Sequence, residues 1–556
     1  MKKLIFALSV SSFTMAVLMA QEKVDEATSA RMRSEELEHS KIMHTLHMLT
    51  DRYGPRVTGT PNHEAAAKWA VAEMTSWGMK NGHLEPWDFG RAGWLNESAT
   101  GQIAAPVREN LKFEVLAWTP STKGTVNASA MEIVLPQGPP APATEDAAGG
   151  RGGRGGGRGG APARLGPTKE EMDQWLAATR DKVRGKIVLV GKAAVIPVNF
   201  DPPAKRRSDE QVKAQYDGTG DGRGGRGARG GRGGGTPDPN RLTTVQVGER
   251  VDAMLLSGGA LMRINDAARG EGIIVAQAHR AYDITKTVPT VILRNDDYGR
   301  IERLLEDGDD VKLAFNIVNH TYPEGKTSYN TIAEIPGTDK ADEVVMLGGH
   351  LDSWHGGTGA TDNAIGCSIM MEAARLLEAL DLKPRRTVRV ALWSGEEEGL
   401  LGSLAYVKQH FGTAEDPKPE WFKLDAYFNI DSGTGRPRGA GVFGPAEAAA
   451  ALRGVFGLFT DWGVAGVSNT NSRATGGTDS TSFNNAGLPG IGMSQDPIEY
   501  GSMTHHTNLD TYERIIPDDV EKAAAIIASA VWNVANREQM IPRFTKETMP
   551  APVAAR

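Results

Sequence analysis

Two stretches of the chain decide its fold: EVVMLGGHLDS at residues 343–353 and TVRVALWSGEEEG at residues 387–399. Each is an apolar run of strand length that ends in glycine and charged residues. A helical pattern begins near Ala364, between the two runs, and another follows the second run. Because apolar strands alternate with helices from Tyr329 onward, the sequence predicts an α/β sheet with helices on both faces.

The rest of the chain divides into further parts around this region. Residues 1–20 have a basic start, an apolar run and a small residue at Ala20, which predicts a cleaved signal peptide. The apolar run is short and contains serine and threonine, which disfavours a membrane anchor. Residues 21–126 are expected to begin the main domain and residues 326–545 to complete it, with an inserted domain at residues 127–325.

Composition limits the classes of protein that need to be considered. The length of 556 residues allows roughly two to four domains. The formal charge of -7 provides no overall field that would attract nucleic acid or anionic lipid. The one cysteine, Cys367, cannot form an internal disulfide and is expected to be a small buried core residue.

The expected insert combines strand-like runs with two glycine and arginine tracts. The runs are GKIVLVG at residues 185–191, EGIIVAQ at residues 271–277 and VPTVILR at residues 288–294. The tracts lie at residues 149–160 and 222–235 and cannot bury enough apolar surface to fold alone. Arg-Gly repeats can bind single-stranded nucleic acid when aromatic residues are interleaved, but these tracts contain none, which favours mobile surface insertions.

Five polar clusters follow strands or turns of the α/β region. They are GGHLDSW at 348–354, GATDNAIG at 359–366, SGEEEGLLGS at 394–403, YFNIDSGTG at 427–435 and MTHHTNLDTY at 503–512. His350 and Asp352 stand two residues apart on a strand, so Asp352 can orient the ring of His350. Singly, each cluster also fits a structural role, such as a helix cap for Asp362 or a core histidine. Together they supply the His, Asp and Glu side chains that suit zinc or a similar divalent ion, with one glutamate left as a base.

The order of these clusters resembles peptidase family M28, with a His-x-Asp pair, a GAxDN turn, an EExGLxGS segment, an Asp after a strand and a late HTxxDT. The resemblance implies a phosphorylase/hydrolase-like zinc exopeptidase fold with a mixed, mostly parallel sheet. It extends to the helical segment at residues 56–79. From about Asn127 to Tyr322 the chain resembles a small β-rich protease-associated (PA) insert, although the glycine and arginine tracts depart from that pattern.

The same resemblance implies a two-metal site with two Zn²⁺ or similar divalent ions. One ion would be held by His350, Asp362 and Asp431, and the second by Asp362, Glu397 and His506. Asp362 would bridge the ions, Glu396 would be the general base, and Asp352 would orient His350. Glu398 falls on a variable family position, and the adjacent His505 makes an HH pair that resembles the carboxypeptidase Q branch of the family.

The implied function is that of an exported exopeptidase, periplasmic or extracellular, that hydrolyses bonds at peptide ends. The usual activity of the family favours an aminopeptidase, whereas the HH pair and the long insert favour a carboxypeptidase Q-like dipeptidase. An inactive binding protein with a peptidase fold and a one-zinc glutaminyl cyclase-like transferase are further interpretations, disfavoured by the complete set of ligand residues.

The expected partner is a peptide, with no nucleic acid and no stable membrane insertion, and a homodimer is compatible with the sequence. TGGTDSTSFNNAG at residues 475–487, with Asp479 and Phe483, resembles the family segment that lines the specificity pocket. A polar turn before the following strand is the structural alternative for this segment.

Overall fold

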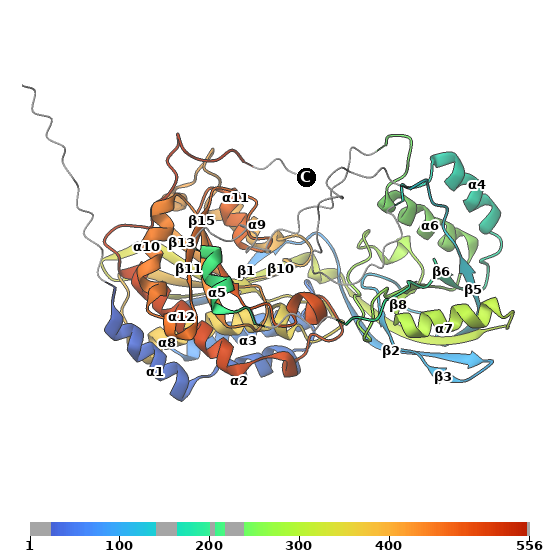
Figure 1. Cartoon of the computed structure of the whole chain (residues 1–556), viewed down its shortest axis with the longest axis horizontal. Coiled ribbons are helices and arrows are strands. Elements are labelled where there is room, and N and C mark those ends of the chain that lie inside the picture. The colour runs from blue at the N-terminus through green and yellow to red at the C-terminus, as the bar shows by residue number, and fades with distance from the viewer. Residues whose placement is uncertain (1–23, 141–163, 201–205, 217–237, 553–556) are drawn as a thin grey trace, which may run out of the picture.

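The computed structural model describes residues 24–140, 164–200, 206–216 and 238–552. The expected signal peptide and both glycine and arginine tracts lie outside these described residues. The described residues form two sheets, side by side, each with its own helices (Figure 1). None of the described helices combines the length and the apolar character that crossing a bilayer requires.

The first sheet is mixed and contains eight strands. In order across the sheet they are β1 (Lys80–Asp88), β10 (Thr327–Ile335), β12 (Arg386–Trp393), β11 (Lys340–His350), β13 (Leu424–Asn429), β16 (Gly490–Gln495), β14 (Pro437–Phe443) and β15 (Gly466–Thr470). The pairs β12–β11, β11–β13, β13–β16 and β14–β15 are parallel, and the other neighbouring pairs are antiparallel. Three of the parallel pairs, from β12 to β16, lie at the centre of the sheet, so the ends of β11, β12 and β13 meet at one edge.

Side chains of the central strands alternate between two cores, one on each face of the sheet. On β11, Val345 and Leu347 belong to the larger core, whereas Met346 between them belongs to the smaller one. The larger core is covered by α1 (Glu26–His39), α2 (Ile42–His47), α3 (Pro61–Ser76), α8 (Ile365–Ala379), α10 (Ala446–Gly457) and α12 (Pro517–Asn536). The smaller core is covered by α9 (Leu401–His410) and α11 (Ser480–Asn485). The predicted α/β fold, with a mixed, mostly parallel sheet and helices on both faces, is confirmed.

The second sheet also has eight strands and its own helices. In order they are β3 (Glu109–Asn110), β2 (Gly93–Ala105), β9 (Lys312–Tyr322), β5 (Val126–Ile133), β6 (Ile187–Val190), β7 (Met262–Asp266), β8 (Thr290–Leu293) and β4 (Phe113–Val115). Val188 packs with α4 (Lys169–Thr179) and α6 (Thr244–Gly258), whereas Ile187 and Leu189 pack with α7 (Asn295–Glu306). Three strands of this sheet, β2, β3 and β4, precede residue 127. We call residues 93–322 of this sheet and its helices the second domain.

One segment within these limits leaves the second domain. Helix α5 (Asp209–Tyr216) packs on β15 of the first sheet. The aromatic ring of Tyr216 fills the space beside Gly439 and Gly466, where a Cβ on Gly439 would lie 2.4 Å from the Tyr216 hydroxyl oxygen. This part of the inserted sequence is therefore anchored to the first domain.

The strand prediction for the insert is correct in two places and wrong in one. The runs at 185–191 and 288–294 contain β6 and β8. The run at 271–277 forms no strand and instead crosses toward the first domain as an irregular segment. Ile274 and Ala276 are buried in a small cluster with Ile292, so the apolar pattern has a packing cause without a sheet ladder.

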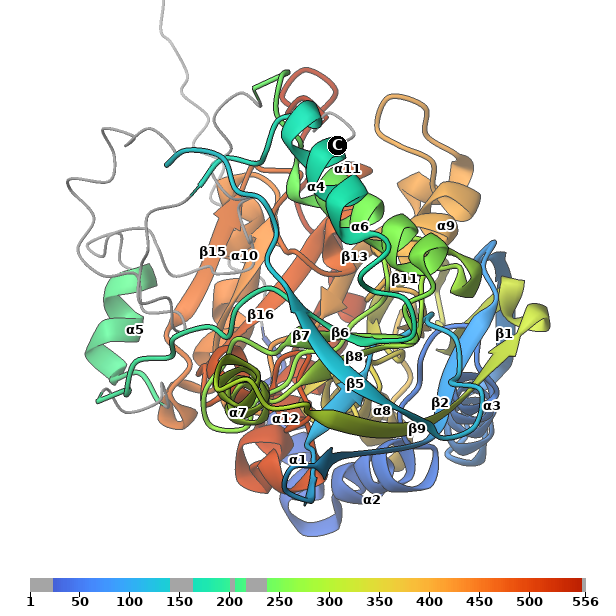
Figure 2. The same ribbon diagram turned by 90° about the vertical axis from the view of Figure 1, so that its right-hand side faces the viewer.

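Two chain connections between the domains, at residues 89–93 and 322–326, run together. The Phe89 N–H donates to the Lys326 carbonyl over 2.8 Å. A Cβ on Gly93 would lie 1.8 Å from the Gly59 carbonyl oxygen, so glycine is required where these segments touch. Figure 2 shows the result, with the second sheet standing in front of the first when the molecule is turned.

Candidate active site

The expected site residues gather at the edge where the central parallel strands end. His350 is the last residue of β11, and the acidic triplet Glu396–Glu398 follows β12. Asp431 follows β13, and Asp362 lies in a short turn (Ala360–Ala364) that leads into α8, where its own backbone angles are not helical. His506 comes from a loop after β16. This is the edge at which open α/β sheets bind ligands.

The five expected ligand residues form two groups that share Asp362. His350 Nε2 lies 3.3 Å from Asp362 Oδ1 and 3.6 Å from Asp431 Oδ1. On the other side, His506 Nε2 lies 3.3 Å from Asp362 Oδ2 and 2.9 Å from Glu397 Oε2. Each oxygen of Asp362 therefore faces a different histidine, and the structure brings all five residues together.

The donor set fits a pair of divalent cations. His350 Nε2, Asp362 Oδ2 and Glu397 Oε1 are buried and make no hydrogen bond. Ligand atoms of His350, Asp362 and Asp431 lie within 4.8 Å of one another, close enough to hold one ion. Burying several carboxylates and imidazoles without hydrogen bonds is costly unless cations face them. Nitrogen and carboxylate oxygen donors in this number suit zinc.

Burial and neighbouring charges shift the pKa values of the residues in this cluster. Burial opposes the charged form of His350, but Glu396, Asp362 and Asp431 outweigh burial and raise the pKa of His350 well above its usual value. Burial also opposes ionisation of Asp362, yet His350 and both neighbouring histidines lower the pKa of Asp362. For Glu396, burial comes first, and the nearby Asp431 and Glu397 carboxylates add to it, so its pKa is raised well above the usual value. Carboxyl groups thus crowd around Glu396, whereas histidines offset the charge of Asp362.

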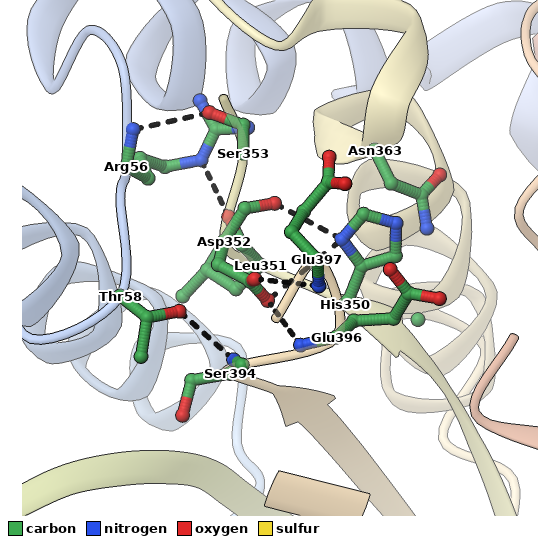
Figure 3. A network of polar contacts seen from close by, with 12 residues as sticks. Arg56, Thr58, His350, Leu351, Asp352, Ser353, Asn363, Ser394, Glu396 and Glu397 are labelled. Carbon is green, nitrogen blue, oxygen red and sulfur yellow. Dashed lines mark hydrogen bonds and ion pairs between the residues drawn. The ribbon is translucent and has the colours of Figure 1, made fainter. Parts of the chain in front are cut away.

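Asp352 holds the site together in a different way from the expected one (Figure 3). The ring Nδ1 of His350 lies 3.0 Å from the backbone carbonyl of Asp352, closer than the 3.8 Å to its carboxylate. The Asp352 carboxylate instead accepts the backbone N–H groups of Glu396, at 3.3 Å, and Glu397, at 3.2 Å. One residue therefore fixes both the ring of His350 and the start of the acidic triplet.

The HH pair places a second histidine near the shared carboxylate. The rings of His505 and His506 stack with centroids 3.7 Å apart. His505 Nε2 lies 3.9 Å from Asp362 Oδ2, farther than the 3.3 Å of His506. Atoms of Asp362, His505 and His506 also lie close enough to hold an ion. The shorter distance and the contact with Glu397 favour His506 as the ligand.

Three supporting residues were not singled out from the sequence. Asp510 accepts the backbone N–H groups of Thr361, at 2.6 Å, and Asp362, at 3.1 Å, and so fixes the turn that carries the shared carboxylate. Tyr500 donates its hydroxyl to Asp431 Oδ1 over 3.1 Å. Arg56 is buried and donates to the carbonyls of residues 351, 358 and 359 around that turn. Asp510 lies in the segment MTHHTNLDTY, and Arg56 opens the helical segment at residues 56–79, so the sequence motifs pointed to both regions.

Most of the segment expected to line a specificity pocket is buried, although Thr475 and Gly477 are exposed. Phe483 is fully buried and stacks on Tyr427, with ring centroids 4.1 Å apart, so it belongs to the smaller core. Asp479 is also buried, and burial raises its pKa to about 7. A small pocket at the site is lined by other residues, namely Trp354, Gly357, Gly359, Asp362, Glu397, His506, Thr507 and Asp510.

The segment that carries these residues is similar to a known protein family. A family model described as peptidase family M28 matches residues 330–531, the range that contains all five expected ligands and Glu396. This segment of the chain belongs to peptidase family M28. The resemblance read from the five motifs is confirmed.

Curated relatives match about half of the chain or less. Carboxypeptidase Q of Rattus norvegicus is 34% identical over 256 residues, which cover 46% of this chain and 52% of the relative. Leupeptin-inactivating enzyme 1 of Streptomyces exfoliatus is 27% identical over 226 residues, covering 38% of this chain and 49% of the relative. The chain therefore spans about half the length of the curated relatives it matches.

Solved structures resemble the chain over almost its whole length. A peptidase M28 precursor from Shewanella amazonensis aligns with a TM-score of 0.61 at 22% identity, covering 94% of this chain and 98% of that one. An aminopeptidase from Aneurinibacillus sp. aligns with a TM-score of 0.50 at 17% identity, covering 93% and 100%. At these identities the matches establish the fold.

Proposed function

We propose that this M28 peptidase is an exported exopeptidase with two zinc ions that removes residues from peptide ends as an aminopeptidase. The observation that carries the proposal is the shared carboxylate, because Asp362 presents one oxygen to His350 and the other to His506. Two adjacent cations bridged in this way are a recurring arrangement for hydrolysis. A structural neighbour from Bacillus subtilis bears the name zinc aminopeptidase, which supports the choice of metal.

The proposed ligand sets follow the two groups in the structure. The first ion would be held by His350, Asp362 and Asp431, and the second by Asp362, Glu397 and His506. Bound zinc supplies positive charge that polarises a substrate carbonyl and favours ionisation of water. The chain's own residues would do the rest of the chemistry.

Glu396 is the residue proposed to move the proton. Its carboxylate would accept a proton from the attacking water and then donate it to the nitrogen of the leaving amine, so that the peptide bond breaks without a free amide anion. The raised pKa of Glu396 reflects burial and neighbouring carboxylates, and bound cations would oppose that shift. Asp352 would position Glu396 through the backbone hydrogen bond described above.

A carboxypeptidase Q-like dipeptidase is the second candidate function. It is favoured by the curated relatives named carboxypeptidase Q and by the stacked HH pair next to Asp362. We further propose that residues 1–20 direct export, that residues 127–325 correspond to a PA-like insert, and that peptides are the partners.

Mass spectrometry of a peptide mixture incubated with the mature protein and zinc tests the proposal. Ladders shortened from the N-terminus would support the aminopeptidase, and cleavage of dipeptides alone or loss from the C-terminus would support the second candidate. The Glu396→Ala protein is the control for contaminating peptidases. Absence of cleavage together with absence of metal binding would overturn the proposed function in favour of an inactive binding protein.

A further inference from the structure

The second domain touches the loop that carries His506. The Ile274 N–H donates to Asn508 Oδ1 over 2.8 Å, and the Asn508 N–H donates to the Ile274 carbonyl over 3.1 Å. The Asn508 side-chain amide also donates to the Gly272 carbonyl over 3.2 Å. This is the same irregular segment, residues 271–277, whose apolar pattern suggests a strand. The contact brings the second domain to the edge of the metal-ligand cluster.

At the end of that segment, Gln277 reaches the ring of His506. The terminal amide nitrogen of Gln277, Nε2, lies 2.9 Å from His506 Nδ1. The other ring nitrogen, Nε2, faces Glu397 and Asp362. Gln277 is itself held in place, because its backbone carbonyl accepts the Ala117 N–H over 3.0 Å. An anchored side chain of the second domain therefore contacts the side of His506 that points away from the carboxylates.

The two ring nitrogens cannot serve the same purpose. If Nε2 binds a cation, the imidazole must carry its proton on Nδ1, and that N–H needs an acceptor. The oxygen and nitrogen of a glutamine amide exchange places by a half-turn of the last torsion, so Gln277 can present Oε1 to Nδ1. His350 meets the same need differently, with the backbone carbonyl of Asp352 near its Nδ1.

His506 also has a backbone conformation that needs external support. Its φ of 62° lies in the left-handed region, which is uncommon for residues other than glycine. The hydrogen bonds between Asn508 and residues 272–274 hold the loop two residues beyond this point.

We infer that Gln277 is a positioning residue for the metal centre, whose side-chain oxygen accepts a hydrogen bond from the Nδ1–H of His506 and so makes the second domain part of that centre. This inference rests on the proposed two-metal function. It assigns to the second domain a role at the catalytic edge in addition to any contact with substrate.

Cobalt titration of the apoprotein tests this inference without an activity assay, because Co²⁺ bound at these ligands absorbs visible light. Gln277→Met keeps the length of the side chain but removes the acceptor, and it should weaken binding of one of the two ions about 10–100-fold. Gln277→Glu restores an acceptor and should bind both ions at least as tightly as the unchanged protein. Gln409→Met, an exposed position on α9, is the matched control.

The outcomes separate this inference from the proposed function. Equal Co²⁺ affinity in Gln277→Met and in the unchanged protein would overturn the role of Gln277 while leaving the two-metal site intact. Equal weakening in Gln277→Met and Gln277→Glu would show a structural contact only and would also overturn it. Failure of the unchanged protein to bind Co²⁺ would overturn both proposals. If Gln277→Met does not fold, Gln277→Asn replaces it, because the shorter side chain withdraws the acceptor and should weaken the same ion.

Discussion

The two halves of the candidate metal centre are built in different ways. In the His350 half, His350 is fully buried at the end of a central strand, and its ring is held by the backbone two residues away. In the His506 half, the His506 side chain is 18% exposed and stands on a loop with φ of 62°. That loop is supported by residues 272–277 of the second domain. Asp362 belongs to both halves.

This difference separates what a sheet can fix from what an interface between domains must fix. A strand end is positioned by its neighbours on both sides, so the His350 half is determined once β11, β12 and β13 pair. A loop has few such constraints and needs contacts from elsewhere. The comparison predicts that substitutions in the His350 half weaken metal binding and folding together. Substitutions at the seam, the contact between the His506 loop and residues 272–277, should weaken the binding of one ion only.

The largest effect should come from the residue that the halves share. Asp362→Ala removes an oxygen ligand from each ion, so we expect loss of both ions and a decrease in kcat of more than about 10⁴-fold, beyond the contribution of one acid-base group. Elemental analysis of the purified protein beside kinetics measures both. Asp342→Ala, with an exposed carboxylate on β11, is the control. Retention of one tightly bound ion by Asp362→Ala would contradict the shared role.

The second largest effect should come from a substitution that lowers kcat but leaves both ions bound. Glu396→Gln keeps the shape of the side chain but removes the base, and kcat should fall by about 10²–10⁴-fold with both ions retained. Glu398→Gln is the control, because it is the member of the triplet outside the proposed roles. Loss of turnover in the Glu398 variant and not in the Glu396 variant would shift the assignment along the triplet.

The same contrast explains which features could be predicted from sequence. The α/β fold and four of the five ligand positions are local features, because these four ligands end or follow an apolar strand or lie in a glycine-bounded turn. The fifth, His506, lies in a loop and is marked by the HTxxDT motif. The contact of Gln277 with His506 joins residues 229 positions apart, and no local pattern records it. The strand predicted at residues 271–277 was wrong for a related reason, since Ile274 is buried by contacts that only the folded domains provide. Phe483 shows the converse, because a segment read as a pocket lining is part of the core.

A smaller effect is expected from the seam itself. Asn508→Ala removes the two side-chain hydrogen bonds to Ile274 and Gly272, which should lower the free energy of unfolding by about 1–3 kcal/mol. One ion should also bind more weakly while the ion of the His350 half is retained. Denaturant unfolding and metal titration measure these changes. Asn469→Ala removes one side-chain hydrogen bond to the Gly444 carbonyl in the first domain and should leave metal binding unchanged.

The smallest effect is a pH dependence of stability that comes from a buried carboxyl pair outside both halves of the metal centre. The contribution of this pair must be measured before any pH dependence is attributed to the metal centre. Glu36 on α1 and Glu372 on α8 are both fully buried, and Ser40 donates to Glu36 Oε1 over 2.8 Å. Burial first, and then the Glu372 carboxylate, raise the pKa of Glu36 to about 9. The folded chain therefore holds a proton that the unfolded chain has released above its ordinary pKa of 4.5.

Because the folded state binds more protons in this window, stability should be full below about pH 4.5 and fall as the pH rises toward 9. Glu36→Gln keeps a hydrogen-bond donor without the titration. Between pH 5 and pH 9 the free energy of unfolding of the unchanged protein should fall by about 1 kcal/mol relative to that of Glu36→Gln. This is the equivalent of one pKa unit, less than the full shift, because the folded protein relaxes around the ionised pair. Urea unfolding at both pH values, with the exposed Glu38→Gln as control, measures the difference. Parallel pH curves for Glu36→Gln and the unchanged protein would place the origin of the pH dependence elsewhere, with the carboxylates around Asp362 as the next group to test.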